Sequence, residues 1–127
     1  MTINRCIPLF FLLFSFIKTN AQLEKTDALY KTILAKDSLL FSVGFNTCDI
    51  TQFENQMSNK LAFYHDKDGF SDKGKFLNDI KNGLCKDPQK RQVKRILAEG
   101  STEIFPLYKN GTLYAAIQNG THLFAEN

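Results

Sequence analysis

The stretch IFPLYKNGTLYAAIQ, residues 104–118, decides the fold. Asn110-Gly111 lies between two runs rich in aromatic and β-branched residues, which is the strongest short-range signal for a two-residue β-hairpin. The first run extends back to Gln92, with a bulge or bend expected at Gly100, and the second continues to about Ala125. The second half of the chain is therefore predicted to be antiparallel β structure.

Three helices and one short strand are predicted before this sheet. Apolar residues recur with helical spacing from residue 23 to 45, whereas Asp37 and three lysines fall largely off that stripe. Asp49 can cap a second helix, with Gln52 placed as in a capping box, and Ser71 or Asp72 can cap a third helix that ends near residue 84. The aromatic run at residues 61–66 predicts a strand that ends in an Asp-Gly turn. Helices that precede an antiparallel sheet indicate an α+β domain with the helices on one face.

The first 21 residues have the order of a secretory signal peptide. Arg5 precedes an apolar run at residues 6–17, and small or polar residues lead to a cleavage site near Ala21. The run is shorter than the roughly 20 residues that span a bilayer, although an uncleaved membrane anchor is the alternative. We expect an exported domain of residues 22–127, periplasmic or extracellular, that is not held in a membrane after cleavage.

The charge balance argues against a nucleic-acid partner. The leader contains Arg5 and Lys18 and no acidic residue, so its loss lowers the formal net charge by two, from +3 to +1. A near-neutral exported domain does not have the electrostatic character of a nucleic-acid-binding protein. The basic residues between positions 86 and 95 are therefore interpreted as a solvated strand edge; they are Lys86, Lys90, Arg91, Lys94 and Arg95.

Cys48 and Cys85 remain after cleavage, and an oxidising compartment favours a disulfide between them. Two buried free thiols are the alternative, because pairing depends on geometry. Neither cysteine has a partner at C-x-x-C spacing, and the chain has only two histidines, so no metal site is predicted. Nucleophile-elbow and phosphate-loop spacings are missing as well, and no cofactor is expected.

The order of elements and several phrases resemble the nuclear transport factor 2-like superfamily, and within it the exported members of a domain-of-unknown-function branch numbered 4440. The phrases lie at residues 37–41, 44–49, 63–66, 82–85 and 104–111. The resemblance implies a strongly curved sheet wrapped around a cavity, with helices closing a cone, as in SnoaL-like proteins and ketosteroid isomerase. Such folds serve enzymes, binding modules and dimerisation domains alike, so the resemblance does not imply one activity. Such domains normally continue through another strand pair, so we expect a C-terminally incomplete cone whose last strands are lost or come from a partner.

Pairing outward from Asn110-Gly111 predicts which side chains share a face of the hairpin. Leu107 then faces Tyr114, Glu103 faces Gln118, and Glu99 faces His122 unless a bulge shifts the last pair. Such a face combines apolar walls with convergent polar groups, as ligand cavities do, although a solvated sheet face has the same pattern. The predicted ligand-binding residues are Tyr64, His65, Glu103, Tyr114, Gln118 and His122.

Three functions are compatible with these patterns. We favour a non-catalytic domain that binds a small, partly apolar ligand. An acid/base enzyme acting on a carbonyl or hydroxyl substrate is the second hypothesis, with His122, Asp66 or Glu103 as proton carriers. The third is a structural module that forms homodimers through its sheet.

Overall fold

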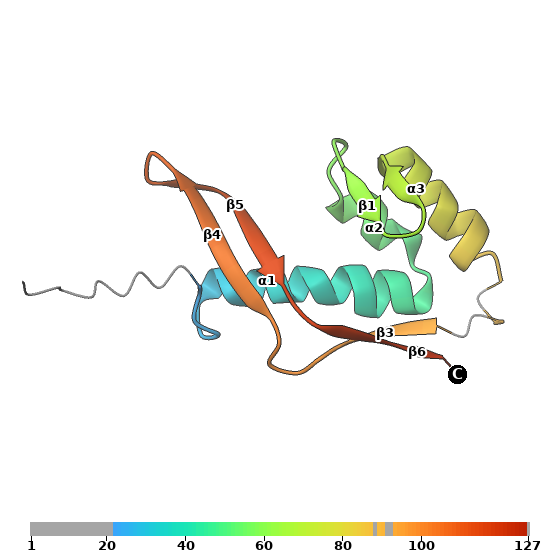
Figure 1. Cartoon of the computed structure of the whole chain (residues 1–127), viewed down its shortest axis with the longest axis horizontal. Helices are drawn as coiled ribbons and strands as arrows, with labels where there is room; N and C mark the ends of the chain where they lie inside the picture. The colour runs from blue at the N-terminus through green and yellow to red at the C-terminus, as the bar shows by residue number, and fades with distance from the viewer. Residues whose placement is uncertain (1–21, 88, 91–92, 127) are drawn as a thin grey trace, which may run out of the picture.

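The computed structural model describes residues 22–87, 89–90 and 93–126 and shows an α+β architecture (Figure 1). The helical segments are α1 (Ala28–Ser38), η1 (Leu39–Phe45), α2 (Ile50–Gln56), α3 (Lys73–Asp79) and η2 (Ile80–Leu84). The strands are β1 (Phe63–His65), β2 (Gly69–Ser71), β3 (Val93–Leu97), β4 (Glu103–Lys109), β5 (Thr112–Asn119) and β6 (His122–Glu126). The predicted signal peptide lies outside the described residues.

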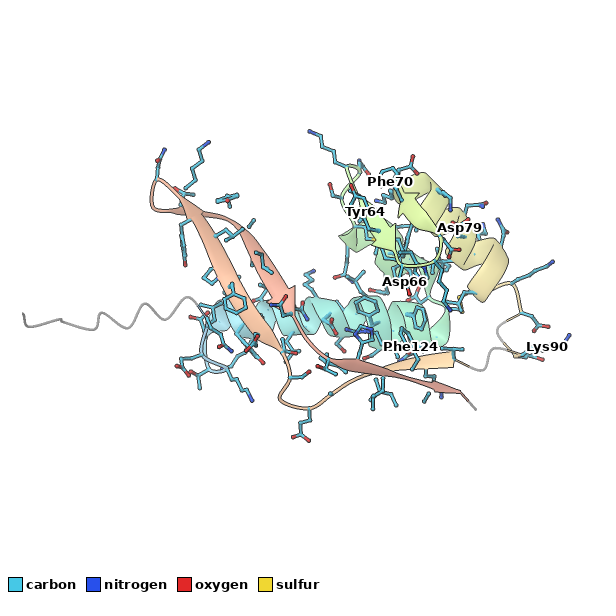
Figure 2. All side chains as sticks on the ribbon, in the orientation of Figure 1. Tyr64, Asp66, Phe70, Asp79, Lys90 and Phe124 are labelled. Carbon is cyan, nitrogen blue, oxygen red and sulfur yellow. A yellow bond between two sulfur atoms is a disulfide. The ribbon has the colours of Figure 1, made fainter. Side chains whose placement is uncertain are left out.

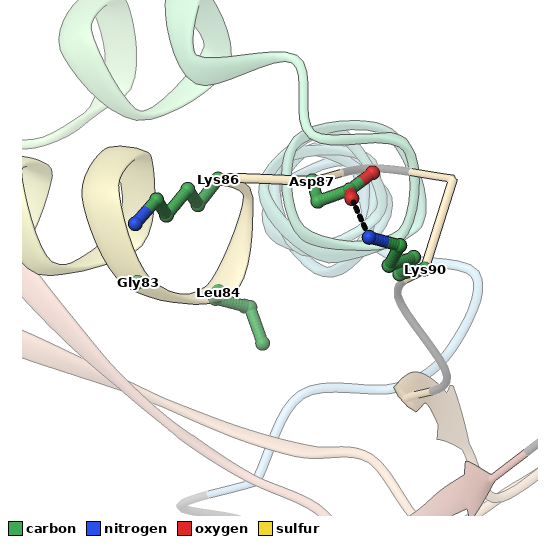
Figure 3. Close-up of a pocket in the computed structure, with 5 residues that line it drawn as sticks. All are labelled: Gly83, Leu84, Lys86, Asp87 and Lys90. Carbon is green, nitrogen blue, oxygen red and sulfur yellow. Dashed lines mark ion pairs between the residues drawn. The ribbon is translucent and has the colours of Figure 1, made fainter.

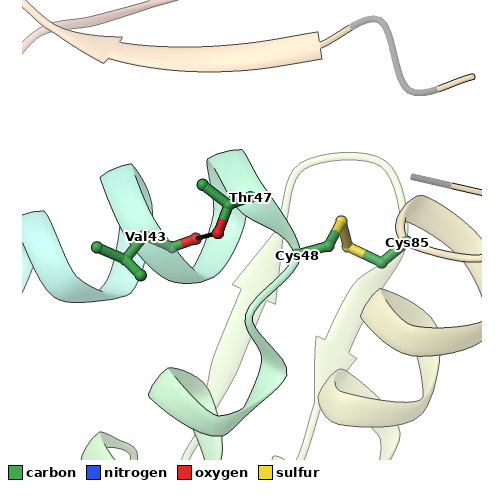
Figure 4. Close-up of a disulfide and its surroundings, with 4 residues drawn as sticks. All are labelled: Val43, Thr47, Cys48 and Cys85. Atoms are coloured by element: carbon green, nitrogen blue, oxygen red, sulfur yellow. Dashed lines mark hydrogen bonds between the residues drawn. A yellow bond between two sulfur atoms is a disulfide. The ribbon is translucent and has the colours of Figure 1, made fainter. Parts of the chain in front are cut away.

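The first predicted helix is α1 together with η1, a π-helical continuation. Asp27 caps its start, since its Oδ1 accepts a hydrogen bond of 2.7 Å from the Leu29 N–H. At its end the Thr47 hydroxyl donates to the Val43 carbonyl over 2.7 Å (Figure 4). One long helix is thereby held between two side-chain hydrogen bonds.

The two other helices begin where the sequence predicts. Asp49 accepts from the Thr51 N–H at 3.2 Å, and Asp72 accepts from the Lys75 N–H at 2.8 Å. The Gln52 amide donates to the Asp49 carboxylate, whereas in a capping box its oxygen would accept from the Asp49 backbone N–H. Hydrogen bonds from Thr51 and Gln52 lower the pKa of Asp49.

An aromatic cluster and a disulfide hold α2, α3 and the β1–β2 hairpin together. The Phe76 ring lies 5.5 Å from the Phe53 ring and 4.8 Å from the Phe63 ring, and both Phe53 and Phe76 are buried. Cys48 and Cys85 are joined by the predicted disulfide, which ties the end of η1 to the end of η2 (Figure 4). The predicted disulfide is thus confirmed.

In the described part of the chain the strands form three two-stranded antiparallel ladders, β1–β2, β3–β6 and β4–β5. The last two follow one another as a single bent arm that crosses α1 (Figure 1). At the bend the Thr121 N–H donates to Ser101 Oγ over 3.1 Å, and the Ala98 N–H donates to the Thr121 carbonyl over 2.9 Å. The predicted strand from residue 92 to 108 is therefore two strands, separated by a turn at Gly100, where φ is +73°.

The register of the β4–β5 hairpin corrects the predicted pairing. Asn110 and Gly111 both have positive φ, as a type I′ turn requires, and Tyr108 pairs with Leu113 as expected. Between Leu107 and Tyr108 the register then shifts by one residue. The extra residue on the returning strand is Tyr114, so every pair beyond it changes partner.

Candidate functional site

Helix α1 and strand β5 of the arm line an open apolar groove of about 450 Å³. Leu29 and Ile33 form its helical wall. The opposite wall belongs to β5 and consists of Leu113, Tyr114, Ala115, Ala116 and Gln118. The volume lies within the range of small-molecule sites, and the lining is apolar except for the tyrosine hydroxyl and the Gln118 amide.

A buried ion pair lies at the Gln118 end of this groove. Asp37, on α1, accepts from Arg95 Nη1 at 3.0 Å and from Nη2 at 3.1 Å in a two-pronged contact. The side chains of Arg95 and Asp37 are only 9% and 6% exposed, and the guanidinium carbon lies 3.8 Å from the centroid of the Phe41 ring. Helix α1 and strand β3 are thus fastened by a charge-assisted contact that is shielded from water.

Gln118 connects the groove to the ion pair. Its Nε2 donates to Asp37 Oδ1 over 3.1 Å, which fixes the orientation of the amide. No side chain or backbone group in the described part of the chain donates to its Oε1. Gln118 is half-buried, so this oxygen is an oriented acceptor that a ligand hydroxyl or amide could meet.

The ion pair corrects two sequence-based expectations. The sequence pattern predicts Arg95 on a solvated strand edge and Asp37 off the apolar stripe of the helix, whereas both side chains are buried and paired with each other. Lys86, Lys90 and Lys94 are exposed as predicted, and Arg91 lies outside the described residues. Alternation along β3 could have pointed to Arg95, because it follows Val93 and precedes Leu97 on one face of the strand.

The predicted clustering of Glu103, Gln118 and His122 is wrong. Because of the bulge, Glu103 pairs with Asn119 while Gln118 pairs with buried Ile104, so Glu103 and Gln118 occupy opposite faces. His122 pairs with Leu97 rather than with Glu99. The carboxylate–imidazole pair proposed for acid/base chemistry is therefore not assembled across this ladder.

His122 instead belongs to an aromatic surface beside the ion pair. Its ring lies 5.2 Å from the Phe124 ring, edge to face, and Phe124 lies 6.2 Å from Phe45 of η1. Phe124 pairs with Arg95 across the β3–β6 ladder, so both side chains are directed towards the helix. Figure 2 shows Phe124 on the arm beside that helix.

The other predicted site residues lie on the β1–β2 hairpin (Figure 2). Tyr64 is 76% exposed and its ring lies 5.4 Å from that of Phe70. His65 Nδ1 lies 3.2 Å from the Lys67 N–H and 3.3 Å from Asp66 Oδ1, and Asp66 is exposed in the turn. The partners of His65 therefore belong to the turn in which Asp66 lies.

A second hollow, of about 550 Å³, lies at the end of η2 (Figure 3). Gly83, Leu84 and Lys86 line it together with Asp87 and Lys90, whose charged groups lie 3.1 Å apart. The Lys90 side chain is 86% exposed, so this ion pair contributes little free energy and does not hold a polar group in a fixed position for a ligand. We therefore take the α1–β5 groove as the candidate site.

The described residues contain no group of three or more His, Cys, Asp or Glu side chains placed to hold a metal ion. In the same part of the chain, no helix is long and apolar enough to cross a membrane. Comparisons of the chain with protein-family models, with curated proteins and with solved structures found no match.

Proposed function

We propose that the domain binds a small, partly apolar molecule in the α1–β5 groove. The observation that carries this proposal is the combination of apolar walls with one oriented amide, Gln118, whose position is set by the buried Asp37–Arg95 pair. Ligand sites typically combine apolar surface with a few fixed polar groups, because the first supplies affinity and the second supplies orientation.

The groove also suggests the chemistry of the ligand. Leu29, Ile33 and Leu113 offer aliphatic contacts, and the Tyr114 ring offers a flat surface. Gln118 Oε1 requires a hydrogen-bond donor, so we expect a ring or short chain bearing a hydroxyl or an amide N–H. The nuclear transport factor 2-like resemblance supports the proposal to the extent that it implies a cavity lined by the sheet and closed by helices.

The proposal can be tested with a fluorescent apolar probe, 1-anilinonaphthalene-8-sulfonate, and two matched tyrosine variants. Tyr114 lines the groove and is 64% exposed, whereas Tyr108 is 59% exposed on the same hairpin but outside the groove. Removal of the Tyr114 ring should weaken probe binding by about tenfold, which corresponds to roughly 1.4 kcal/mol.

Fluorescence titration of the two variants gives the comparison. We expect Tyr114→Ala to raise the dissociation constant and Tyr108→Ala to leave it within about twofold of the original protein. Equal losses in the two variants would place the probe elsewhere on the exposed hairpin and would remove the support for a groove ligand.

A further inference from the structure

Strands β3 and β4 each have one residue whose backbone is hydrogen-bonded on the side away from its partner strand. On β4 the Ile104 carbonyl accepts from the Leu23 N–H over 2.8 Å. On β3 the Asn46 side chain donates to the Arg95 carbonyl and accepts from the Arg95 N–H, both over 2.8 Å. These bonds show which backbone groups of β3 and β4 point away from the ladder.

The same bonds identify the outward groups of the opposite edge, because antiparallel pairs alternate between bonded and non-bonded. The backbone N–H and C=O groups of Ile104 and Arg95 point away from the ladder, so those of their partners Gln118 and Phe124 do as well. The same holds for Ala116, which lies two residues before Gln118 on β5. Ala116 faces Pro106, which has no N–H to give to the ladder, in agreement with this alternation. Within the described residues, nothing bonds to these outward groups of β5 and β6.

This edge lacks charge and proline, two of the features that keep strand edges apart, although β5 has a bulge at Tyr114 near its start. The fourteen residues from Thr112 to Ala125 contain no Lys, Arg, Asp, Glu or Pro. Natural sheets usually protect an open edge with charges, proline or a covering element. Five large apolar side chains along it are between 42% and 64% exposed: Leu113, Tyr114, Ile117, Leu123 and Phe124.

We infer that the β5–β6 edge pairs with the same edge of a second copy of this chain. In a two-fold symmetric contact both partners bring the same edge, so an excess of one charge on that edge would repel its copy. Residues 112–125 carry no formal charge and avoid that repulsion, and Glu126 at the end of β6 is the one charge in the sequence of these two strands, whereas β3 and β4 carry Lys94, Arg95, Glu103 and Lys109. The neutral edge is thus compatible with self-pairing, in which main-chain hydrogen bonds join two arms into one sheet.

The inference is independent of the proposed ligand, although the two features adjoin. Ala116 and Gln118 take part in both, through their side chains in the groove and their backbone groups at the edge. A partner strand bonded to β5 would extend the β wall of the groove along its length. Dimer formation can nevertheless be measured without any ligand.

Two isoleucines of equal exposure provide the test. Ile117 on β5 is 49% exposed and Ile96 on β3 is 50% exposed. Ile117→Lys adds a positive charge to the pairing edge of each copy, so the two edges should repel, whereas Ile96→Lys places the same charge on the other edge of the arm. Sedimentation velocity of the full chain over a range of concentrations should show dimers for the original protein and for Ile96→Lys. The dimer of Ile117→Lys should have a dissociation constant at least tenfold higher than that of the original protein.

Ala116→Pro tests the backbone directly, because it removes an outward N–H without removing a bond of the β4–β5 ladder. It should also shift the protein to monomers, and circular dichroism checks that the fold is retained. A protein that stays monomeric at all concentrations would overturn the inference, as would dimers that persist in Ile117→Lys. Probe binding by such a monomer would leave the groove proposal standing, so the two failures are distinguishable.

Discussion

At the scale of single residues, Asp37 and Arg95 should be costly to replace one at a time, because both charges are buried. Two ions withdrawn from water lose several kcal/mol of hydration each, and only their mutual contact with further hydrogen bonds offsets that cost. Asp37 is well supplied, with two bonds from Arg95 and one from Gln118. Arg95 is less so, since its buried Nε has no hydrogen-bond partner among the described residues. The pair therefore serves to fix the position of β3 on α1 more than to add stability.

A double-mutant cycle should separate these two roles. We expect Arg95→Leu alone to destabilise the fold by about 3–5 kcal/mol, because it leaves the Asp37 carboxylate buried without its cation. Asp37→Leu alone should cost a similar amount, whereas the double variant should lose far less than the sum. Urea unfolding of the four proteins measures the coupling. Additive losses would mean that the two charges do not depend on each other.

At the scale of elements, the contact between η1 and α2 depends on a missing side chain. A Cβ at Gly44 would lie 3.1 Å from Cε2 and 3.2 Å from Cζ of Phe53, and 3.1 Å from Cβ of Gln52. Phe53 is 1% exposed and is held against Phe76, so it has no room to move away. The close approach of the two helices therefore requires glycine at this position.

Gly44→Ala and Gly83→Ala should shift stability in opposite directions. Alanine favours a helix over glycine by about 0.8–1 kcal/mol at either position. At Gly44 the overpacking should exceed this gain and give a net loss of about 1 kcal/mol. A Cβ at Gly83 meets no atom within 4 Å, so that variant in η2 should be more stable by roughly 0.5–1 kcal/mol. Thermal unfolding gives both signs, and a stabilised Gly44→Ala would show that Phe53 can yield.

The elements were more predictable from the sequence than their register. Periodicity, caps and the Asn-Gly turn are local signals, so three helices, the disulfide partners and the β4–β5 turn could be expected. The shift at Tyr114 has no such signal, because no local residue pattern marks the extra residue of this bulge. Because the register differs by one residue, Gln118 lies on the opposite face from Glu103 and contacts Asp37 instead. The predicted polar face is therefore wrong, although Tyr114 and Gln118 still line a groove.

At the scale of the whole molecule, two clusters meet near Cys48. One consists of α2, α3 and the β1–β2 hairpin around Phe53 and Phe76, and the other consists of the arm fastened to α1 and η1 through Arg95. The disulfide joins them, because Cys48 follows η1 and Cys85 ends η2, 37 residues later. All of the first cluster lies within the loop that the disulfide closes. Its stability should therefore depend more on the disulfide than that of the arm.

Reduction should lower the free energy of unfolding by about 4 kcal/mol, the loop-closure entropy expected for a ring of this length. The measurement is urea unfolding with and without dithiothreitol in a Cys6→Ser background, which removes the third thiol of the chain. Cys48→Ser/Cys85→Ser in that background should match the reduced protein and be insensitive to reductant. Hydrogen exchange of the reduced protein should accelerate first in α2 and α3, because both helices lie within the loop that the disulfide closes. It should accelerate later in β3 and β6, because Arg95 still holds β3 to α1. Uniform acceleration in all elements would show instead that the two clusters unfold as one unit.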